Sequence, residues 1–230
     1  MDSEPTGAQS IEARLAHWDK TYQNYELPNY PSQFAVFVCD YLDNKQNIIE
    51  FGCGSGRDAL FFAGLGFKVS GFDGSKVGIE RCIGNTPDDV SSRPAFKHLR
   101  IDGDWSGEQL AEISAGIRSS LDTSQRTLVY ARFFLQSITK EEQQNFLDLL
   151  LALDVRNMMC AFEFRTLRDE GQSKITQPHY RRFIDSLQLL KEMDSRGFNI
   201  EYFVEGFGLA KFKTEDAHVA RVVFTSPEQG

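Results

Sequence analysis

A length of 230 residues suits a single α/β domain, and a hydrophobic share of 41% with 25% charged residues is ordinary for a globular enzyme. The net charge of −8 argues against nucleic acid as the main partner, because proteins that neutralise many phosphates carry a basic face. No stretch approaches the ~18 apolar residues of a membrane span, and the four scattered cysteines form no CxxC pair, which argues against a zinc site or a disulfide frame.

Apolar residues at helical spacing predict two helices at the N-terminal end. Trp18 and Tyr22 share one face of a predicted helix over 11–25, and a second helix is predicted over about 32–43, after a proline-rich elbow. We expect residues 1–45 to form a helical lid in which these two aromatic side chains cover a site. The acidic, polar N-terminus is the opposite of a secretory signal, so we expect a cytoplasmic protein without membrane insertion. We expect it to be a monomer or a homodimer.

Strands and helices alternate in the central part of the chain. The predicted strands cover 47–51, 67–72, 95–101, 127–133 and 157–164, and the predicted helices cover 57–66, 76–83, 107–121 and 140–153. Ser75 is the expected N-cap of the second of these helices, and Thr139 with Glu142 forms the expected capping box of the fourth. The alternation predicts a mainly parallel sheet with helices on both faces, and a cofactor-binding core over 46–165.

The alternation of strands and helices becomes less regular in the C-terminal part of the chain. A polar loop follows residue 165, then a helix is predicted over about 179–196 and two strands over 199–206 and 218–225. The short connection between the two strands predicts that they pair antiparallel. We expect residues 166–230 to supply a substrate loop, a helix and a closing strand pair within the same single domain.

Three glycines directly follow the first predicted strand. The segment IIEFGCGSG places Gly52, Gly54 and Gly56 between a strand and a helix, where the missing Cβ atoms let the backbone approach a ligand. A dinucleotide site more often reads GxGxxG, which holds a pyrophosphate. Here the spacing is GxGxG and Glu50 lies just before it, which favours a ligand with a positively charged amino-acid tail, such as S-adenosylmethionine.

Two further acids end the next two predicted strands. Asp73, followed by Gly74, stands where nucleotide-binding α/β folds use a carboxylate to accept both ribose hydroxyls. Asp102, followed by Gly103, ends the third strand and could accept from an adenine amine while the backbone beside it donates. Any one of these acids could be a helix cap or turn former, but acids at the carboxyl ends of successive strands predict a cofactor site.

These motifs resemble the core of the class I S-adenosylmethionine-dependent methyltransferases over residues 46–135. EFGCGSG is similar to the glycine-rich first motif of that family, GFDGS to its ribose-binding turn, Asp102 to its adenine-contacting position and YARFFLQSI to its fourth strand. The resemblance implies a Rossmann-like α/β fold: a mainly parallel seven-stranded sheet with an antiparallel C-terminal strand and helices on both faces. It also implies S-adenosyl-L-methionine as the cofactor and S-adenosyl-L-homocysteine as the product.

The C-terminal third resembles bacterial methyltransferases associated with cell-envelope polysaccharide. The segments that carry this resemblance are EFRTLRDEG, HYRRFID and GFNIEYFVEGFGLAKFKTEDAHVARVVF. Some members of that group act on carbohydrate or phosphate groups. The resemblance therefore implies a small-molecule or glycan-linked substrate.

Residues after the fourth predicted strand should face the acceptor. Arg132 is a candidate catalytic residue and Gln136 a candidate substrate contact. In the resembling family a histidine often stands at the position of Gln136, and an amide cannot act as a general base at neutral pH. A phosphate or carboxylate oxygen, already anionic, would need no base. A metal-dependent enzyme would place an aspartate after this strand, where Ala131 and Arg132 stand, so no metal is expected.

A cationic cluster follows the fifth predicted strand. Arg165 and His179 are candidate catalytic residues, His179 as a general base because its ordinary pKa is near ~6.5, and Tyr180, Arg181 and Arg182 are candidate substrate contacts. Arginine suits bidentate binding of phosphate or carboxylate. Alternatively, the cluster forms ion pairs with nearby acids or a solvated helix face, and His179 is an exposed residue at a helix start.

The pattern as a whole predicts methyl transfer to an oxygen of a small, anionic or carbohydrate-linked acceptor. Two alternatives stay open. One is a non-catalytic S-adenosylmethionine-binding regulatory module, with which a glutamine at position 136 is compatible because it cannot act as a base. The other is an NAD(P)-dependent oxidoreductase, against which the glycine spacing and Glu50 argue.

Overall fold

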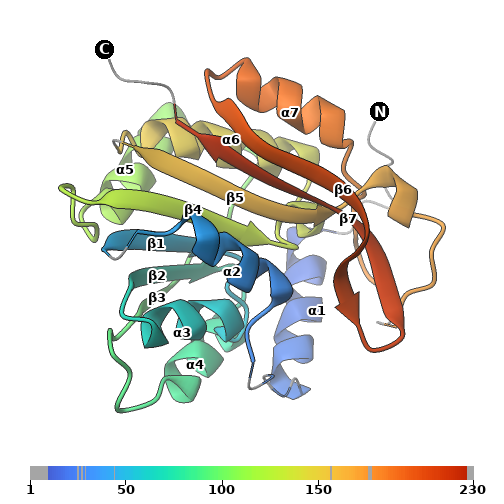
Figure 1. Cartoon of the computed structure of the whole chain (residues 1–230), viewed down its shortest axis with the longest axis horizontal. Helices are drawn as coiled ribbons and strands as arrows, with labels where there is room; N and C mark the ends of the chain where they lie inside the picture. Colours follow the sequence, from blue (N-terminus) through green and yellow to red (C-terminus); the bar gives the residue numbers. More distant parts are fainter. Residues whose placement is uncertain are drawn as a thin grey trace.

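A seven-stranded sheet in the order β3-β2-β1-β4-β5-β7-β6 forms the centre of the protein (Figure 1). The structure is a computed structural model that describes residues 10–24, 26, 28, 30–43, 45–155, 157–175 and 178–226. Its strands are β1 (Gln46–Phe51), β2 (Lys68–Asp73), β3 (Ala95–His98), β4 (Arg126–Arg132), β5 (Met158–Arg165), β6 (Asn199–Phe212) and β7 (Glu215–Thr225). The first five pair in parallel, and β7 runs antiparallel to β5 and β6. The predicted mainly parallel sheet with an antiparallel C-terminal strand is confirmed.

Helices cover both faces of the sheet, as predicted (Figure 1). They are α1 (Ile11–Asn24), α2 (Gln33–Val38), α3 (Arg57–Gly64), α4 (Lys76–Asn85), α5 (Gly107–Arg118), α6 (Lys140–Ala152) and α7 (Ser186–Asp194), with short 3-10 turns η1 (Cys39–Tyr41), η2 (Leu135–Ser137) and η3 (Leu167–Asp169). Both predicted N-caps are confirmed: the Ser75 hydroxyl accepts from the Gly78 amide, and Thr139 and Glu142 form a reciprocal capping box. No helix in the described ranges is long and apolar enough to cross a membrane.

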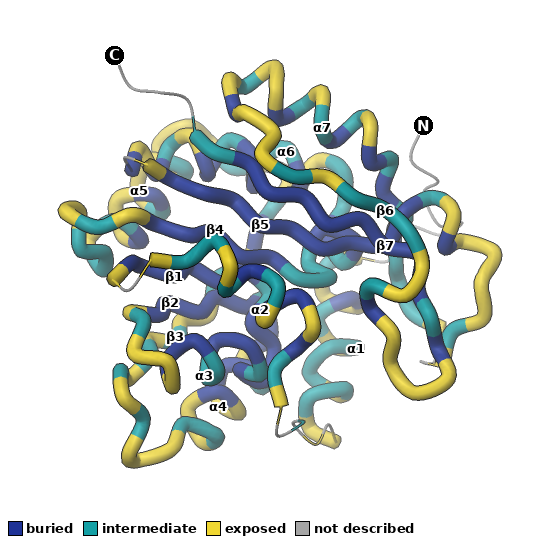
Figure 2. Tube along the Cα trace, in the orientation of Figure 1, coloured by how far each residue is buried: buried dark blue, intermediate teal, exposed yellow. Residues whose placement is uncertain are grey.

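The core lies on both sides of the central strands, which are buried along their length (Figure 2). One cluster packs α5, α6 and α7 against the sheet around Phe146 and Phe162. A second packs α2 and α3 against the other face around Phe34 and Phe62. Strands that are buried on both faces have continuous apolar sequences, which explains why β1 and β5 could be predicted from the sequence.

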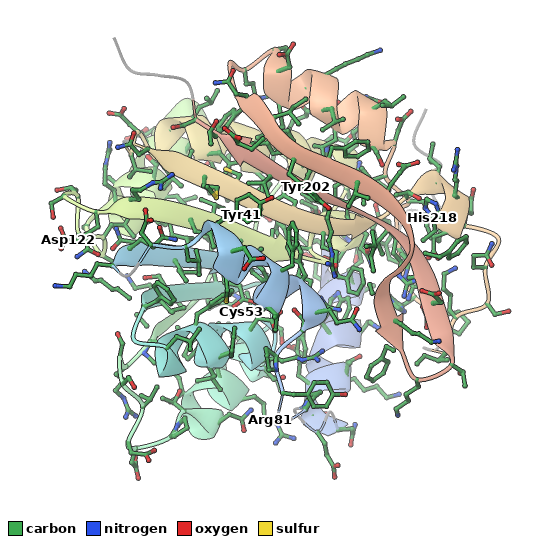
Figure 3. All side chains as sticks on the ribbon, viewed as in Figure 1. Tyr41, Cys53, Arg81, Asp122, Tyr202 and His218 are labelled. Atoms are coloured by element: carbon green, nitrogen blue, oxygen red, sulfur yellow. The ribbon has the colours of Figure 1, made fainter. Side chains whose placement is uncertain are left out.

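The segment after the proline-rich elbow packs across the sheet toward the C-terminal strands. The Phe37 ring lies 5.1 Å from that of Tyr202 on β6, and the Tyr41 ring lies 6.5 Å from it (Figure 3). The helix predicted over 32–43 is divided into α2 and the short turn η1. The two tyrosines therefore tie the N-terminal segment to the opposite edge of the fold.

The predicted helix over 179–196 is wrong in its first half. Helix α7 begins at Ser186, where the Asp185 side chain accepts from the Gln188 amide and caps it. Before that cap, the amides of Arg182 and Ile184 donate to the carbonyls of Gln136 and Arg165, at 2.9 and 3.0 Å. Tertiary hydrogen bonds thus use backbone groups that a helix would have needed.

The closing strands are longer than predicted. Strand β6 continues to Phe212 and β7 begins at Glu215, so a two-residue turn replaces the expected loop, with Lys213 at φ 54°. An irregularity in pairing between Gly206 and Ala210 bends the hairpin. Its far end curls toward α1, at the edge of the sheet where the parallel strands end (Figure 1).

Candidate functional site

The glycine turn links β1 to α3 at the point where the strand order reverses, between β1 and β4. Ligands of open α/β sheets bind outside the carboxyl ends of the strands at such a point. Gly52, Gly54 and Gly56 all have positive φ angles, of 73°, 57° and 91°. A Cβ on Gly54 would lie 2.9 Å from the Tyr22 hydroxyl of α1, so a side chain there would have to displace the Tyr22 ring in addition to adopting a strained backbone conformation.

Asp73 fixes the glycine turn against the end of β2. Its Oδ2 accepts from the Gly54 amide at 2.8 Å and its Oδ1 from the Ser75 amide at 2.7 Å. Burial raises the pKa of this carboxyl to about 6, although both backbone hydrogen bonds favour the charged form. A carboxylate has about four lone-pair positions, so Asp73 keeps acceptor capacity for a ligand hydroxyl.

Glu50 lies beneath the turn and is 4% exposed. Its Oε2 atom has no hydrogen-bond partner among the described residues. Burial raises the pKa of Glu50 well above its ordinary value, and the neighbouring charge of Asp58 raises it further. A buried carboxyl with an unsatisfied oxygen beside a cavity is a site for a positively charged ligand.

A cavity of about 360 Å³ joins these groups; we call it the cofactor cavity. Gly52 and Gly54 of the glycine turn line it together with Glu50, Asp73 and Gly74. Helix α1 forms one wall through Arg14, Leu15, Trp18 and Tyr22, and the segment after β3 forms another through Leu99, Arg100 and Ile101. The cavity thus matches a ligand with polar groups along one side and an apolar body.

A second cavity of about 480 Å³, the acceptor cavity, adjoins the first. Both are lined by Trp18, Thr21, Arg57, Arg132 and Phe133. The far wall of the acceptor cavity comes from the β6–β7 hairpin, through Ala210, Phe212 and Glu215. Its lining holds five basic side chains and one carboxylate: Lys20, Arg57, Arg132, Arg165, Arg181 and Glu215. An acidic protein therefore encloses a cationic cavity next to its glycine turn.

Buried carboxylates neutralise two of these arginines. Glu163 accepts from Nε of Arg132 at 2.9 Å and from Nε of Arg221 at 2.7 Å. Arg165 donates to Asp169 at 2.6 Å and also pairs with Glu215. Both guanidinium groups are thereby held in place at the cavity wall, and their charges are largely compensated.

Phe133 lies on the wall shared by the two cavities in a strained conformation. Its φ of 54° is unusual for a residue with a side chain. Its ring lies below the Arg132 guanidinium, 4.4 Å from the centroid, and its amide donates to the Glu163 carbonyl at 2.7 Å. Strain of this kind persists only where surrounding contacts enforce it, and such positions cluster at functional sites.

Two stacked imidazoles line the acceptor cavity between α1 and the loop before α7. The rings of His17 and His179 are 4.3 Å apart and 13° from parallel. Arg181 lies 3.2 Å from Nε2 of His179, and because a guanidinium only donates, this nitrogen acts as the acceptor. Burial, followed by the charges of Arg181 and Lys20, lowers the pKa of His17. The lowered pKa favours the neutral form of His17 at neutral pH.

Comparison with solved structures assigns the fold. A methyltransferase from Anabaena variabilis, described as S-adenosylmethionine-dependent, aligns with a TM-score of 0.66 at 18% identity over 97% of each chain. Magnesium protoporphyrin IX methyltransferase from Synechocystis with bound S-adenosylhomocysteine aligns with a TM-score of 0.57 at 15% identity, over 96% of this chain and 89% of that one. The [4+2]-cyclase SpnF aligns with a TM-score of 0.66 at 12% identity over 99% of each chain. No protein-family model and no curated protein matches the sequence.

The chain has the fold of the class I S-adenosylmethionine-dependent methyltransferases. In this methyltransferase fold, most of the predicted cofactor residues line the cofactor cavity: Glu50, Gly52, Gly54, Asp73 and Gly74. Three predicted cofactor residues do not line it: Gly56, Asp102 and Gly103. Gly56 packs against Cys82 and Leu60, Asp102 pairs with Arg100 at 2.6 Å, and Gly103 packs on Glu141. The wall uses Leu99, Arg100 and Ile101 instead, so adenine contacts by Asp102 and Gly103 stay predictions.

The predicted acceptor residues divide into two groups. Arg132, Gln136, Arg165, His179 and Arg181 line the acceptor cavity. Tyr180 lies under Arg14 instead, with the guanidinium 4.9 Å from its ring, and Arg182 is fully buried and donates to Gln143 and to the Leu135 carbonyl. Tyr180 and Arg182 thus contact other parts of the fold and line neither cavity.

Gln136 has a positioning contact in this fold. Its side-chain oxygen accepts from the Arg165 amide at 2.9 Å, which ties the turn after β4 to the end of β5. The Gln136 side chain thus holds two strand ends together. Of the described residues, no group of three or more histidine, cysteine, aspartate or glutamate side chains could hold a metal ion.

The lining of the acceptor cavity also includes residues that the sequence analysis did not predict, among them three with a basic or imidazole side chain: His17, Lys20 and Arg57. His17 and Lys20 lie on one face of α1, three positions apart, next to the predicted aromatic Trp18. Arg57 begins α3 immediately after the glycine turn, and donates to the carbonyls of Tyr30 and Pro31. His17 and Lys20 could have been predicted from the sequence, because they lie beside the aromatic Trp18 on the helix that was expected to cover the site.

Proposed function

We propose that this protein transfers the methyl group of S-adenosylmethionine to an oxygen of an anionic small-molecule or carbohydrate-linked acceptor. The observation that carries the proposal is the pair of adjoining cavities. One is lined by the glycine turn and by buried acids that include Glu50 and Asp73, and the other is lined by five basic side chains and a single carboxylate.

The residues of the cofactor cavity fit S-adenosylmethionine. Asp73 has acceptor capacity for ribose hydroxyls, and the unsatisfied oxygen of Glu50 suits the positive charge of the amino-acid portion. When bound, S-adenosylmethionine supplies an electrophilic methyl group on a sulfonium. Trp18 and Tyr22 of α1 cover the cavity and would exclude water from the bound ligand.

The acceptor cavity favours a nucleophile that is already anionic. The Gln136 amide cannot take a proton, and its oxygen is occupied by the Arg165 amide. The basic side chains around the cavity, two of which are held in place by buried carboxylates, would bind and orient a phosphate or carboxylate. Arg132 and Phe133, on the shared wall, mark where the acceptor oxygen would meet the methyl group, so alignment is their main contribution.

The fold also serves reactions other than methyl transfer, since the aligned SpnF is described as a [4+2]-cyclase. Binding of S-adenosylmethionine is therefore necessary for the proposal but not sufficient. A non-catalytic binding module or another reaction would bind the cofactor and leave every offered acceptor unmethylated.

The proposal is tested by transfer of a labelled methyl group. The protein is incubated with methyl-labelled S-adenosylmethionine and with phosphorylated sugars, sugar acids and matched neutral sugars. We expect label in an anionic acceptor, none in its neutral counterpart, and loss of transfer in Arg132→Met. Transfer to neutral sugars alone, or to amines alone, would contradict an anionic oxygen acceptor.

A further inference from the structure

The two sides of the acceptor cavity differ in chemistry, and the difference indicates which kind of acceptor fits. This inference rests on the proposed function and concerns the part of the acceptor that is not methylated. Arg57, Arg132 and Phe133 line both cavities, so they lie on the side that faces the cofactor. Ile175 and Phe212 line only the acceptor cavity, and they belong to the loop after η3 and to the β6–β7 hairpin (Figure 1).

The side that faces the cofactor supplies positive charge through Arg57. Its guanidinium donates to the carbonyls of Tyr30 and Pro31, at 3.0 and 3.1 Å. Among the described residues no carboxylate forms an ion pair with Arg57, whereas Arg132 is paired with Glu163. Because a guanidinium has five N–H donors, Arg57 keeps donors for an anionic group, together with a charge that no ion pair compensates.

The far side of the cavity exposes two large apolar side chains. Ile175 and Phe212 are 45% and 36% exposed although both line the cavity. Both adjoin Glu215: the Ile175 amide donates to its Oε2 at 3.0 Å, and Phe212 is paired opposite it in the hairpin. Apolar surface that stays in water inside a ligand cavity is typical of a site that an apolar part of the ligand covers.

Glu215, the charged group beside these two side chains, is already satisfied. Its Oε1 pairs with Arg165 and its Oε2 accepts from the Ile175 amide. A hydroxyl-rich ligand would have to compete for these oxygens, and it would leave the apolar side chains in contact with water. An apolar chain or ring needs no hydrogen-bond partner and removes apolar surface from water, so it suits this side better.

We propose that the acceptor is an amphipathic anion. Its anionic oxygen lies on the side that faces the cofactor, beside Arg57 and Arg132, and its apolar chain or ring lies against Ile175 and Phe212. The two apolar residues then determine specificity: among anionic acceptors they favour alkyl or aryl phosphates and carboxylates over fully hydrophilic ones. Neither residue touches the reacting atoms, so their effect is on the binding of the acceptor.

The experiment compares methyl phosphate with hexyl phosphate, which carry the same charged group and differ in the length of the apolar chain. Binding of each is measured by calorimetry on protein saturated with S-adenosylhomocysteine, so that the cofactor cavity is filled. We expect hexyl phosphate to bind at least about tenfold more tightly than methyl phosphate, because its methylene groups leave water against Ile175 and Phe212.

Substitutions separate the two sides of the cavity. Phe212→Ser should weaken binding of hexyl phosphate at least about fivefold and leave methyl phosphate unchanged. Phe203→Ser is the matched control, because Phe203 lies on the same strand, is also 36% exposed and lines neither cavity; it should change neither affinity. Arg57→Met should weaken both phosphates about tenfold. Unchanged binding of S-adenosylhomocysteine by both phenylalanine variants shows that they are folded.

Equal affinity for the two phosphates would overturn the inference, and so would equal effects of Phe212→Ser and Phe203→Ser on hexyl phosphate. Binding of neither phosphate to protein saturated with S-adenosylhomocysteine would overturn it as well, while leaving the cofactor site intact. Failure of S-adenosylhomocysteine itself to bind would instead contradict the proposed function, so the two failures are distinguishable.

Discussion

Glu50 illustrates how a single residue can serve binding at the expense of stability. At neutral pH an unfolded chain ionises this carboxyl freely, whereas the folded protein buries it with one oxygen unsatisfied. Because folding raises the pKa of Glu50, its unfavourable contribution is present above the ordinary glutamate pKa and disappears below it. A positive ligand would relieve the same penalty.

Replacing Glu50 by glutamine should therefore stabilise the cofactor-free protein. We expect Glu50→Gln to raise the free energy of unfolding by roughly 1–3 kcal/mol at neutral pH, and by little below about pH 4, where both states are protonated. The same variant should bind S-adenosylmethionine more weakly. Chemical unfolding at several pH values measures the first effect, with the exposed Glu112→Gln as control. A variant less stable than wild type at neutral pH would contradict this account of Glu50.

Individual residues also show how far a sequence reveals a site. Glu50 and Asp73 were predictable because their positions follow from a local motif beside a strand end. Gln136 and Arg182 have contacts that depend on segments distant in the chain: Gln136 accepts from Arg165, and Arg182 donates to Gln143. The sequence therefore did not reveal which basic residues of the cluster line a cavity and which are buried in contacts with distant segments.

At the scale of the element, helix α4 supports the glycine turn through a residue that no motif marks. A Cβ on Gly78 would lie 2.7 Å from the Gly54 carbonyl oxygen and 3.1 Å from Cδ2 of Tyr22. Gly84, in the same helix, has no atom within 4 Å of such a Cβ. The helix thus provides its own matched pair of substitutions.

Gly78→Ala should displace the glycine turn and weaken S-adenosylhomocysteine binding by at least about tenfold, or ~1.4 kcal/mol. Gly84→Ala should leave binding unchanged and stabilise the protein by up to about 1 kcal/mol, because alanine has the higher helix propensity. Calorimetry and thermal unfolding measure the two effects. Equal binding by both variants would show that α4 does not shape the turn.

Helix α1 is held over the cofactor cavity by a buried ion pair. Arg14 donates to both carboxylate oxygens of Glu142 and, at 3.1 Å, to the Ser137 carbonyl. Arg14 and Glu142 are 6% and 4% exposed, so removing the cation leaves a buried, uncompensated charge. This contact joins the N-terminal helix to the start of α6.

Arg14→Met should destabilise the protein by about 3–5 kcal/mol and speed amide hydrogen exchange in α1. Adding Glu142→Gln should recover part of the loss, because the buried charge is then gone. The exposed pair of Arg126 and Asp43 supplies the control, and Arg126→Met should cost less than about 1 kcal/mol. Equal losses of unfolding free energy in Arg14→Met and Arg126→Met would contradict a stabilising role for the buried Arg14–Glu142 ion pair.

Element boundaries were predictable where local signals act alone. Ser75 and Thr139 begin their helices as expected because each caps with its own side chain. The start of α7 was misplaced because residues before Asp185 form hydrogen bonds to Gln136 and Arg165, which no local pattern reports. The extension of β6 and β7 was missed because its exposed hairpin lacks the apolar alternation of a half-buried strand.

At the scale of the whole molecule, the two cavities have different origins in the chain. The cofactor cavity is lined by residues between Ile11 and Glu142, in and around the motif-bearing strands. The acceptor cavity adds residues from β5, the loop before α7 and the C-terminal hairpin. Most of the predicted cofactor residues therefore line the first cavity, whereas the second cavity combines five predicted acceptor residues with segments that no local motif marks.

A ligand that binds only the folded molecule raises its stability. S-adenosylhomocysteine at about 100 times its dissociation constant should add about 2.7 kcal/mol, which for a chain of this size raises the thermal midpoint by roughly 5–10 °C. NAD at the same concentration should leave the midpoint unchanged. A larger shift with NAD would favour an oxidoreductase.

The most direct test of the central claim is calorimetric titration of S-adenosylmethionine into the wild type and into Asp73→Asn. Asparagine keeps one acceptor oxygen for the turn but removes the carboxylate that the ribose would use. We predict stoichiometric binding to the wild type and at least about tenfold weaker binding to the variant, while the exposed Asp43→Asn binds as the wild type. Folded wild-type protein that binds neither S-adenosylmethionine nor S-adenosylhomocysteine would contradict the account.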